Sequence, residues 1–238
     1  MTETGTAEEG EVAAFERLAA QWWDPRGPMA PLHAMNAARV GWIAARAPAG
    51  ARLLDVGCGA GIAAEALARM GFQVTGLDAG AALIAAARAH ADPALGINYR
   101  AGTTAGMIAQ GARFPVVTCL EVLEHVDDPA HFVGELARLL EPGGQLFLST
   151  VNRTAASFLT AKLGAEYILR MLPVGTHDWK RFIKPGELSD MMRGAGMRVA
   201  DIAGLAPGLA GWHTVRRPGT NYIVEAVADQ AGAAIRPR

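Results

Sequence analysis

The sequence of 238 residues has little cysteine, almost no net charge and no long uncharged hydrophobic stretch. Two cysteines, Cys58 and Cys119, are too few for a disulfide framework, which indicates a reducing, intracellular setting. The polar, acidic start is unlike a secretory signal, and no stretch approaches the roughly 20 apolar residues that cross a bilayer. The 22 basic and 23 acidic residues give a net charge of −1, so the protein as a whole has no electrostatic attraction to nucleic acid. We therefore expect a cytoplasmic protein that does not act on nucleic acid.

The N-terminal part of the chain has helical patterns and no strand patterns. Residues 1–10 are small, polar and acidic, and we expect a disordered tail there. Two helical stretches follow before the first apolar strand, because apolar residues recur at helical spacing. We therefore expect residues 11–50 to form a helical cap within a single domain that covers residues 11–238.

Short apolar strands then alternate with helices. The expected strands are 52–56, 73–77, 97–100, 114–119 and 145–150, and the expected helices between them are 62–70, 81–91 and 130–140. A helix at 185–194 and strands at 197–202 and 222–228 follow nearer the C-terminus. Repeated strand–helix units predict a parallel sheet with helices on both faces. The predicted fold class is α/β, with a doubly wound, mostly parallel sheet.

The alternation of strands and helices breaks after Thr150. Residues 152–184 form an insertion, in which an apolar helical segment precedes a loop rich in histidine, tryptophan and basic residues. A basic amphipathic segment of this kind can lie in a membrane interface. It can equally pack on the protein itself as a lid, and the sequence leaves both interpretations open.

The most informative segment is a glycine-rich loop between an expected strand and an expected helix. It reads LLDVGCGAG over residues 53–61, and its glycines let a ligand approach the backbone closely. Gly57 and Gly59 follow the spacing G-x-G-x-G, without the second gap that accompanies a pyrophosphate on a helix N-terminus. Asp55 would repel a pyrophosphate but suits the cationic amino group of S-adenosylmethionine. These features disfavour a nicotinamide dehydrogenase.

An acidic residue follows the second expected strand. Asp78 lies 21 residues after Gly57, close to the spacing at which a carboxylate meets the hydroxyls of a ribose. Its two oxygens can accept hydrogen bonds from both hydroxyls of the diol. The alternative is a glycine turn followed by a solvated aspartate, but loop, acid and flanking strands together favour an adenosine-containing ligand.

The loop and the acid resemble those of the class I S-adenosylmethionine-dependent methyltransferases. The first motif of that family is similar to LDVGCGAG in this chain. The resemblance implies a seven-stranded sheet whose last strand is antiparallel. It also implies contacts to the methionine moiety around Gly57 and contacts to the ribose by Asp78.

Further segments narrow the resemblance. They are QWWD (21–24), PLH (31–33), NAAR (36–39), VTCLEVLEHV (117–126), GAEYILRM (164–171), GTHD (175–178) and KRFIKPGEL (180–188). Together they are similar to segments of the ubiquinone-biosynthesis O-methyltransferases, which act on a polyprenylated catechol and later on demethylubiquinol. The resemblance implies that Arg39, Gly57, Asp78 and Leu120 bind the cofactor. It also implies a polyprenyl-phenol or quinol substrate and other quinone-biosynthesis enzymes as partners. The basic amphipathic insertion would suit such a substrate through peripheral contact with lipid at the inner face of the membrane.

Three candidate catalytic residues follow the fourth expected strand. Methyl transfer to oxygen needs an aligned nucleophile and a group that removes its proton. If the segment after the strand turns helically, Glu121, Glu124 and His125 share one face. They could act as acid–base groups or ligate a divalent ion that gathers both catechol oxygens. The alternative is that one glutamate caps the next helix and the other is solvated.

The family resemblance implies that Glu121, Glu124 and His125 bind Mg²⁺. Magnesium prefers oxygen ligands, so histidine is an unusual partner for it. His177, beside Asp178 in the insertion, is a second candidate base.

Two alternative functions remain open at this point. One is a methyltransferase of the same fold that acts on nitrogen, sulfur or carbon of another small molecule. The other is a non-catalytic S-adenosylmethionine-binding scaffold, which would keep Gly57 and Asp78 but would have no use for His125.

Overall fold

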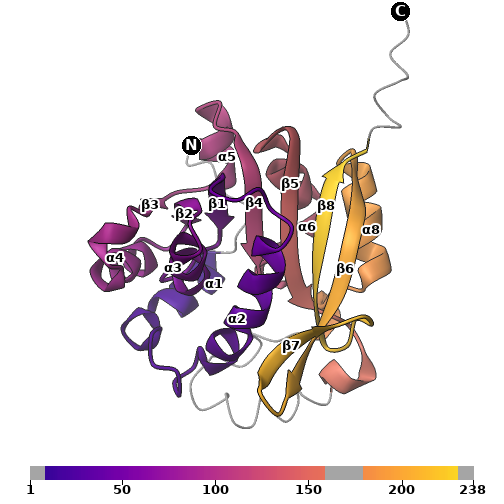
Figure 1. Ribbon diagram of the computed structural model, residues 1–238, viewed down its shortest axis with the longest axis horizontal. Coiled ribbons are helices and arrows are strands. Elements are labelled where there is room, and N and C mark those ends of the chain that lie inside the picture. The colour runs from indigo at the N-terminus through magenta and orange to yellow at the C-terminus, as the bar shows by residue number, and fades with distance from the viewer. Residues whose placement is uncertain (1–8, 159–178, 230–238) are drawn as a thin grey trace, which may run out of the picture.

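In the described part of the chain, eight strands form one sheet in the order β3-β2-β1-β4-β5-β8-β6-β7 (Figure 1). The computed structural model describes residues 9–158 and 179–229. The strands are β1 (Arg52–Val56), β2 (Gln73–Asp78), β3 (Asn98–Ala101), β4 (Phe114–Leu120), β5 (Leu140–Val151), β6 (Met197–Gly208), β7 (Gly211–Val215) and β8 (Asn221–Ala228). Strands β1 to β5 pair in parallel, and β8 is antiparallel to both β5 and β6. The predicted mostly parallel sheet with an antiparallel last strand is confirmed.

The strand β7 was not predicted, so the sheet has eight strands and not seven. It arises because β6 continues past the expected end at Ile202 and folds back as a hairpin, in which Gly208 pairs with Gly211. Gly211 has a φ of +104°, a backbone conformation that favours glycine. The hairpin extends the far edge of the sheet and leaves the order of the other seven strands unchanged.

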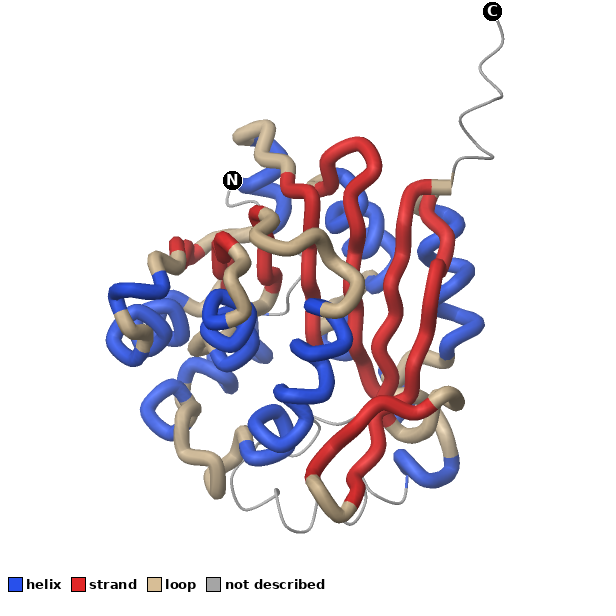
Figure 2. Tube along the Cα trace, in the orientation of Figure 1, coloured by secondary structure: helices blue, strands red, loops and turns tan. Residues whose placement is uncertain are grey.

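Helices cover both faces of the sheet, as predicted (Figure 2). One face packs against α2 (Ala30–Ala44), α3 (Ile62–Arg69) and α4 (Ala81–His90). The other packs against α5 (Thr104–Ala109), α6 (Pro129–Arg138) and α8 (Pro185–Gly194). Short 3-10 helices are η1 (Ala19–Gln21), η2 (Pro93–Leu95), η3 (Leu123–His125) and η4 (Trp179–Arg181).

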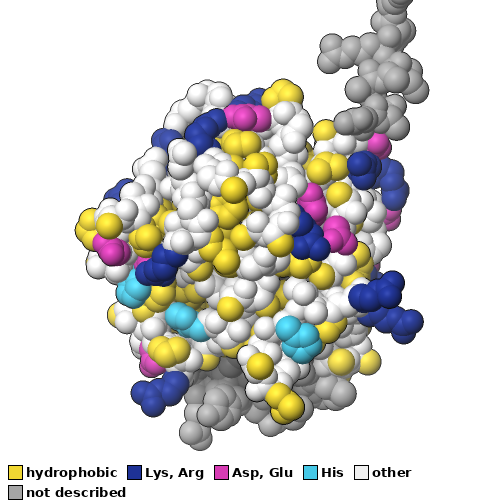
Figure 3. Space-filling view, viewed as in Figure 1, with side chains coloured by type: hydrophobic (Ala, Val, Ile, Leu, Met, Phe, Trp, Pro, Cys, Tyr) yellow, Lys and Arg dark blue, Asp and Glu magenta, His cyan; other side chains and the backbone are white. Residues whose placement is uncertain are grey.

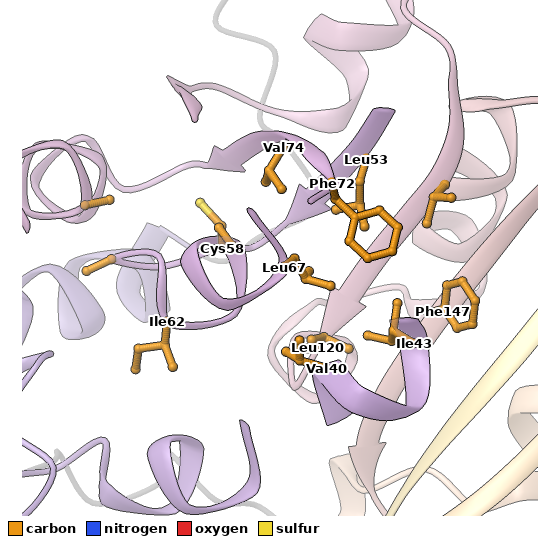
Figure 4. Packing of buried hydrophobic residues seen from close by; sticks show 14 of the residues in the cluster. Val40, Ile43, Leu53, Cys58, Ile62, Leu67, Phe72, Val74, Leu120 and Phe147 are labelled. Atoms are coloured by element: carbon orange, nitrogen blue, oxygen red, sulfur yellow. The ribbon is translucent and has the colours of Figure 1, made fainter. Parts of the chain in front are cut away.

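The helix α2 is anchored by apolar residues that meet the sheet. Val40 and Ile43 of α2 lie beside Leu120 and Phe147 of the strands β4 and β5 (Figure 4). Ile43 and Phe147 are fully buried. Burial of side chains of this size stabilises the fold by roughly 1.5–3 kcal/mol each. This packing fixes the position of Arg39, which precedes Val40 on the same helix.

The N-terminal helix α1 (Glu9–Glu16) begins two residues before the expected start at Glu11, so it includes the last two residues of the expected tail. It packs against α4, and η1 does the same. Residues 1–8 lie outside the described part of the chain. The chain from α1 to α2 thus crosses the sheet edge at which β1, β2 and β4 end.

The insertion is described only at its two ends, up to Phe158 and from Trp179. The candidate base His177 and its neighbour Asp178 lie outside the described residues. Over 9–158 and 179–229, no helix is long and apolar enough to span a bilayer. On the face drawn in Figure 3, basic side chains are dispersed among acidic and apolar ones and do not gather in one patch.

Candidate functional site

The glycine loop joins β1 to α3 in a conformation that only glycine adopts easily. Gly57 has a φ of +69° and Gly59 one of +53°. A Cβ atom on Gly57 would lie 2.4 Å from Cγ2 of Val122, and one on Gly59 would lie 2.3 Å from Cζ2 of Trp22. The loop is further held to β2, because the backbone N–H of Gly57 donates to the carbonyl of Leu77 at 2.8 Å. Both glycines are therefore required by backbone conformation and by space.

Asp78 lies at the carboxyl end of β2, next to the loop. One carboxylate oxygen accepts from the backbone N–H of Gly59 at 2.8 Å and the other from that of Gly80 at 2.8 Å. Burial raises the pKa of Asp78, and these two backbone hydrogen bonds oppose the rise. Each oxygen keeps a second lone pair that can accept from a ribose hydroxyl.

Asp55 is a buried carboxylate in β1 with one unsatisfied oxygen. Its Oδ1 accepts from the hydroxyl of Thr118 at 2.7 Å, whereas Oδ2 is buried without a partner among the described residues. Burial raises its pKa to about 6. A buried carboxylate oxygen without a donor is costly, so a cationic ligand at this position would be bound favourably.

Arg39 is a buried cation that is also incompletely paired. Its side chain is 3% exposed, and Nη2 donates to the carbonyl of Leu32 at 3.2 Å. Nε and Nη1 have no hydrogen-bond partner among the described residues, and Nη1 lies 3.9 Å from Oε1 of Glu121. Burial lowers the pKa of Arg39 despite the nearby carboxylates. Two free donors of a guanidinium suit a carboxylate ligand.

A small cavity brings four of the predicted residues together. It is lined by Trp22, Leu32, Arg39, Asp55, Gly57, Cys58, Ile62, Ala63 and Leu120. An incompletely paired cation and an incompletely paired carboxylate in one cavity suit a ligand that carries one charge of each sign, as the amino-acid end of S-adenosylmethionine does. The cavity lies where the strand order reverses between β1 and β4, the place at which open α/β sheets bind ligands.

The three candidate catalytic residues, Glu121, Glu124 and His125, do not share one helical face as the sequence had suggested. Glu121 has a φ of +57° and precedes η3, so the segment does not form a helix that includes all three. Its oxygens accept from the hydroxyl of Ser149 at 2.7 Å and from the amide of Asn221 at 3.0 Å. Burial raises the pKa of Glu121 to about 7, and the negative charge of the neighbouring Glu124 contributes to this rise to a lesser extent. A positive φ at a residue other than glycine is uncommon and often occurs at functional sites.

Glu124 and His125 belong to η3 and point to different partners. Glu124 is buried and accepts from the hydroxyl of Thr150 at 2.7 Å. Nδ1 of His125 lies 3.2 Å from Oε2 of Glu11 in α1. Burial lowers the pKa of His125, but the hydrogen bond to Glu11 and the nearby carboxylates outweigh burial, so the net shift is upward.

As they lie, Glu121, Glu124 and His125 do not fit a shared magnesium ion. Each side chain is engaged by a separate partner. Within residues 9–158 and 179–229, no group of three or more His, Cys, Asp or Glu side chains could hold a metal ion. The helical arrangement on which the metal hypothesis depended is absent. The magnesium requirement that the resemblance implies therefore stays a prediction, and no step below depends on it.

The sequence reasoning missed the contribution of the N-terminal segment. Glu11 reaches His125, Trp22 lines the cavity, and Trp23 donates from Nε1 to the carbonyl of Ala60 at 2.9 Å. The QWWD segment had been noted only as a family motif. Its two tryptophans, large side chains that need burial, were the available signal that this segment packs on the rest of the domain.

Comparisons with known proteins identify the family to which the chain belongs. Residues 32–202 match the family model described as a methyltransferase domain. The ubiquinone biosynthesis O-methyltransferase of Pseudomonas aeruginosa is 49% identical over 201 residues, which cover 83% of this chain and 87% of that protein. The protein of the same name from Xylella fastidiosa is 44% identical over 228 residues, which cover 94% and 93%.

Solved structures show the same fold. A possible histamine N-methyltransferase from Thermotoga maritima has a TM-score of 0.67 at 17% identity, covering 92% of this chain and all of that one. Magnesium protoporphyrin IX methyltransferase from Synechocystis, with bound S-adenosylhomocysteine, has a TM-score of 0.66 at 21% identity and covers 91% and 94%. At these identities the likeness establishes the fold alone.

The fold and the family model together define a methyltransferase. Within that class, the chain belongs to the family of ubiquinone biosynthesis O-methyltransferases.

Proposed function

We propose that the protein methylates a hydroxyl of a polyprenyl catechol, and later of demethylubiquinol, in ubiquinone biosynthesis. The observation that supports this most is the pair of incompletely paired charges, Arg39 and Asp55, in a cavity that the glycine loop also lines. Relatives of the same named function at 44–49% identity support the choice of substrate.

The cofactor half of the site has a defined division of roles. The Arg39 guanidinium binds the carboxylate of S-adenosylmethionine, and Asp55 binds its ammonium group. Asp78 accepts hydrogen bonds from the ribose hydroxyls. Holding both ends of the cofactor orients the sulfonium methyl for in-line attack and lowers the entropic cost of reaching that geometry.

The acceptor half lies at the end of β4. In the proposed step, His125 takes the proton of the substrate hydroxyl while that oxygen bonds to the methyl carbon. The bond between carbon and sulfur breaks, its electron pair stays on sulfur, and S-adenosylhomocysteine leaves. Glu121 and Glu124 supply negative charge that favours the imidazolium formed in this step.

A membrane-resident polyprenyl tail calls for contact with lipid, which we propose occurs through the ends of the insertion. Phe158 is 44% exposed, and Trp179 packs edge-on against it at 5.6 Å between ring centres. Lys180 and Lys184 follow this aromatic pair along the chain and carry positive charge, as does Arg153, which pairs with Glu187. An apolar element flanked by basic residues binds anionic bilayers.

A vesicle experiment tests the lipid contact separately from catalysis. The protein should sediment with phosphatidylglycerol vesicles at low salt, less with phosphatidylcholine vesicles, and Phe158→Asp should weaken the interaction. Equal sedimentation of wild type and variant would show that Phe158 does not contribute to lipid binding. No sedimentation at low salt would overturn the proposal.

Catalysis is tested with purified protein, S-adenosylmethionine and a short-tailed polyprenyl catechol. We expect one O-methyl adduct by mass spectrometry, and we expect His125→Gln to lower kcat by about 100-fold or more while the Kd for S-adenosylmethionine stays within about twofold. Unchanged kcat in this variant would exclude His125 as the base. Absence of any methylated product from a catechol or a demethylquinol would overturn the substrate assignment.

A further inference from the structure

The N-terminal helix places a carboxylate on the imidazole of His125. Glu11 and His125 are 114 residues apart in sequence, yet Oε2 lies 3.2 Å from Nδ1. Both side chains are mostly buried, with exposed fractions of 15% and 16%. Phe15, one helical turn after Glu11, packs edge-on against the imidazole with ring centres 5.0 Å apart. Two residues on one face of α1 therefore hold the same ring.

The carboxylate of Glu11 is itself held from a third segment of the chain. Its other oxygen, Oε1, lies 3.9 Å from Nη1 of Arg181 in η4. Nη2 of the same guanidinium lies 3.9 Å from Asp127, two residues after His125. The helix α1, the segment after β4 and the end of the insertion thus meet at one carboxylate.

The chemistry of this contact is that of a carboxylate that orients a histidine. A carboxylate accepts a hydrogen bond only from a protonated ring nitrogen, so Glu11 selects the neutral tautomer with its proton on Nδ1. The lone pair is then on Nε2, the nitrogen away from Glu11. The carboxylate also stabilises the imidazolium that forms when Nε2 takes a proton.

We propose that Glu11 is a positioning residue for methyl transfer, which acts from the N-terminal helix by fixing the tautomer and orientation of His125. The proposal rests on the proposed function, in which His125 removes the acceptor proton. It assigns to α1 a role in the acceptor half of the site, beyond covering the cofactor loop.

Three single variants of the full chain test the assignment. Glu11→Ala removes the acceptor and Glu11→Gln keeps a neutral acceptor. The matched control is Glu16→Ala, because Glu16 lies on the same helix and its carboxylate accepts from the backbone N–H of Ala82 at 3.0 Å. The control therefore loosens the docking of α1 without touching His125.

We expect Glu11→Ala to lower kcat by about tenfold or more, with the Kd for S-adenosylmethionine within about twofold of wild type. Glu11→Gln should lower kcat less than Glu11→Ala does, and Glu16→Ala should keep kcat within about twofold of wild type. In the background of His125→Gln, Glu11→Ala should cause no further loss, because the two residues act as one unit.

Nitrogen-15 NMR of the imidazole provides a measurement that does not depend on activity. Wild type and Glu16→Ala should show the proton of neutral His125 on Nδ1, and Glu11→Ala should shift the population toward the other tautomer. An unchanged tautomer in Glu11→Ala, or an equal loss of kcat in Glu16→Ala, would overturn the proposal. If His125→Gln stays active while Glu11→Ala still changes the tautomer, the base assignment fails and the positioning contact stands.

Discussion

Asp55 and Thr118 face each other across the parallel pair β1 and β4, and the threonine hydroxyl donates to Oδ1 of the aspartate at 2.7 Å. The second oxygen, Oδ2, stays buried without a partner in the described part of the chain. The threonine thus fixes the carboxylate with its free oxygen available to a ligand. A cationic group that reaches this oxygen gains a charge-assisted hydrogen bond in a site from which water is excluded.

The pH dependence of cofactor binding follows from this contact. Because burial raises the pKa of Asp55 to about 6, the free protein protonates it as pH falls below that value. The ammonium of S-adenosylmethionine needs the carboxylate, so its Kd should change by only about twofold between pH 7 and pH 6 and should rise below pH 6 by up to about tenfold per pH unit. Calorimetry from pH 5 to 7 measures this. Asp55→Asn should bind weakly with a flat profile, and a profile unchanged from wild type would contradict the role of Asp55.

Arg39 should contribute to the affinity for the amino-acid end of the cofactor alone. Its Nε and Nη1 lack partners in the described structure, and a lost charge-assisted hydrogen bond costs about 1.5–3 kcal/mol. We expect Arg39→Met to weaken binding of S-adenosylmethionine roughly 10- to 100-fold. The control ligand is 5′-methylthioadenosine, which has no amino-acid group and should bind both proteins alike. Equal weakening for both ligands would point to a general collapse of the site.

Gly59→Ala tests the contact between the glycine loop and Trp22. The variant combines a left-handed backbone, which costs about 1–2 kcal/mol, with a Cβ atom 2.3 Å from the indole. The matched control is Gly111→Ala, where φ is +69° and no atom lies within 4 Å of the added Cβ. Both should lower Tm in thermal unfolding, and only Gly59→Ala should weaken cofactor binding. Normal binding by Gly59→Ala would show that Trp22 moves aside freely.

Removal of divalent ions should leave cofactor binding unchanged. The groups assigned to the cofactor are a guanidinium, two carboxylates that are engaged by protein donors, and backbone atoms. We expect the Kd for S-adenosylmethionine in excess chelator to stay within about twofold of its value in magnesium. A chelator effect on Kd would place an ion in the cofactor half, whereas an effect on kcat alone would mean that Glu121, Glu124 and His125 rearrange to bind one.

The sequence was informative where function depends on short-range pattern. Gly57 and Asp78 could be predicted because a glycine loop and an acid after successive strands meet at one sheet edge in any doubly wound fold. Asp55 could be predicted from its place at the strand end. The family resemblance added Arg39, whose helix approaches the loop through packing that no local pattern specifies.

The sequence was uninformative where function depends on contacts between distant segments. Glu11 contacts His125 only because α1 crosses the sheet edge. The two residues are 114 positions apart, so no sequence pattern predicts their contact. The helical turn expected after β4 is absent at Glu121. This residue has a left-handed backbone, and its side chain accepts hydrogen bonds from Ser149 and Asn221. The hairpin of β6 and β7 was not predicted because its turn, Leu209-Ala210, lacks the Asn-Gly or Asp-Gly pair that signals a tight hairpin.

The central claim is tested most directly by incubating the purified protein with S-adenosylmethionine and a short-tailed polyprenyl catechol and identifying the product by mass spectrometry. The account predicts a single O-methyl adduct, with formation strongly reduced in His125→Gln and not restored by added cofactor. Binding of S-adenosylmethionine without methylation of the catechol or of a demethylquinol would contradict the assigned substrate, although the methyltransferase fold would stand.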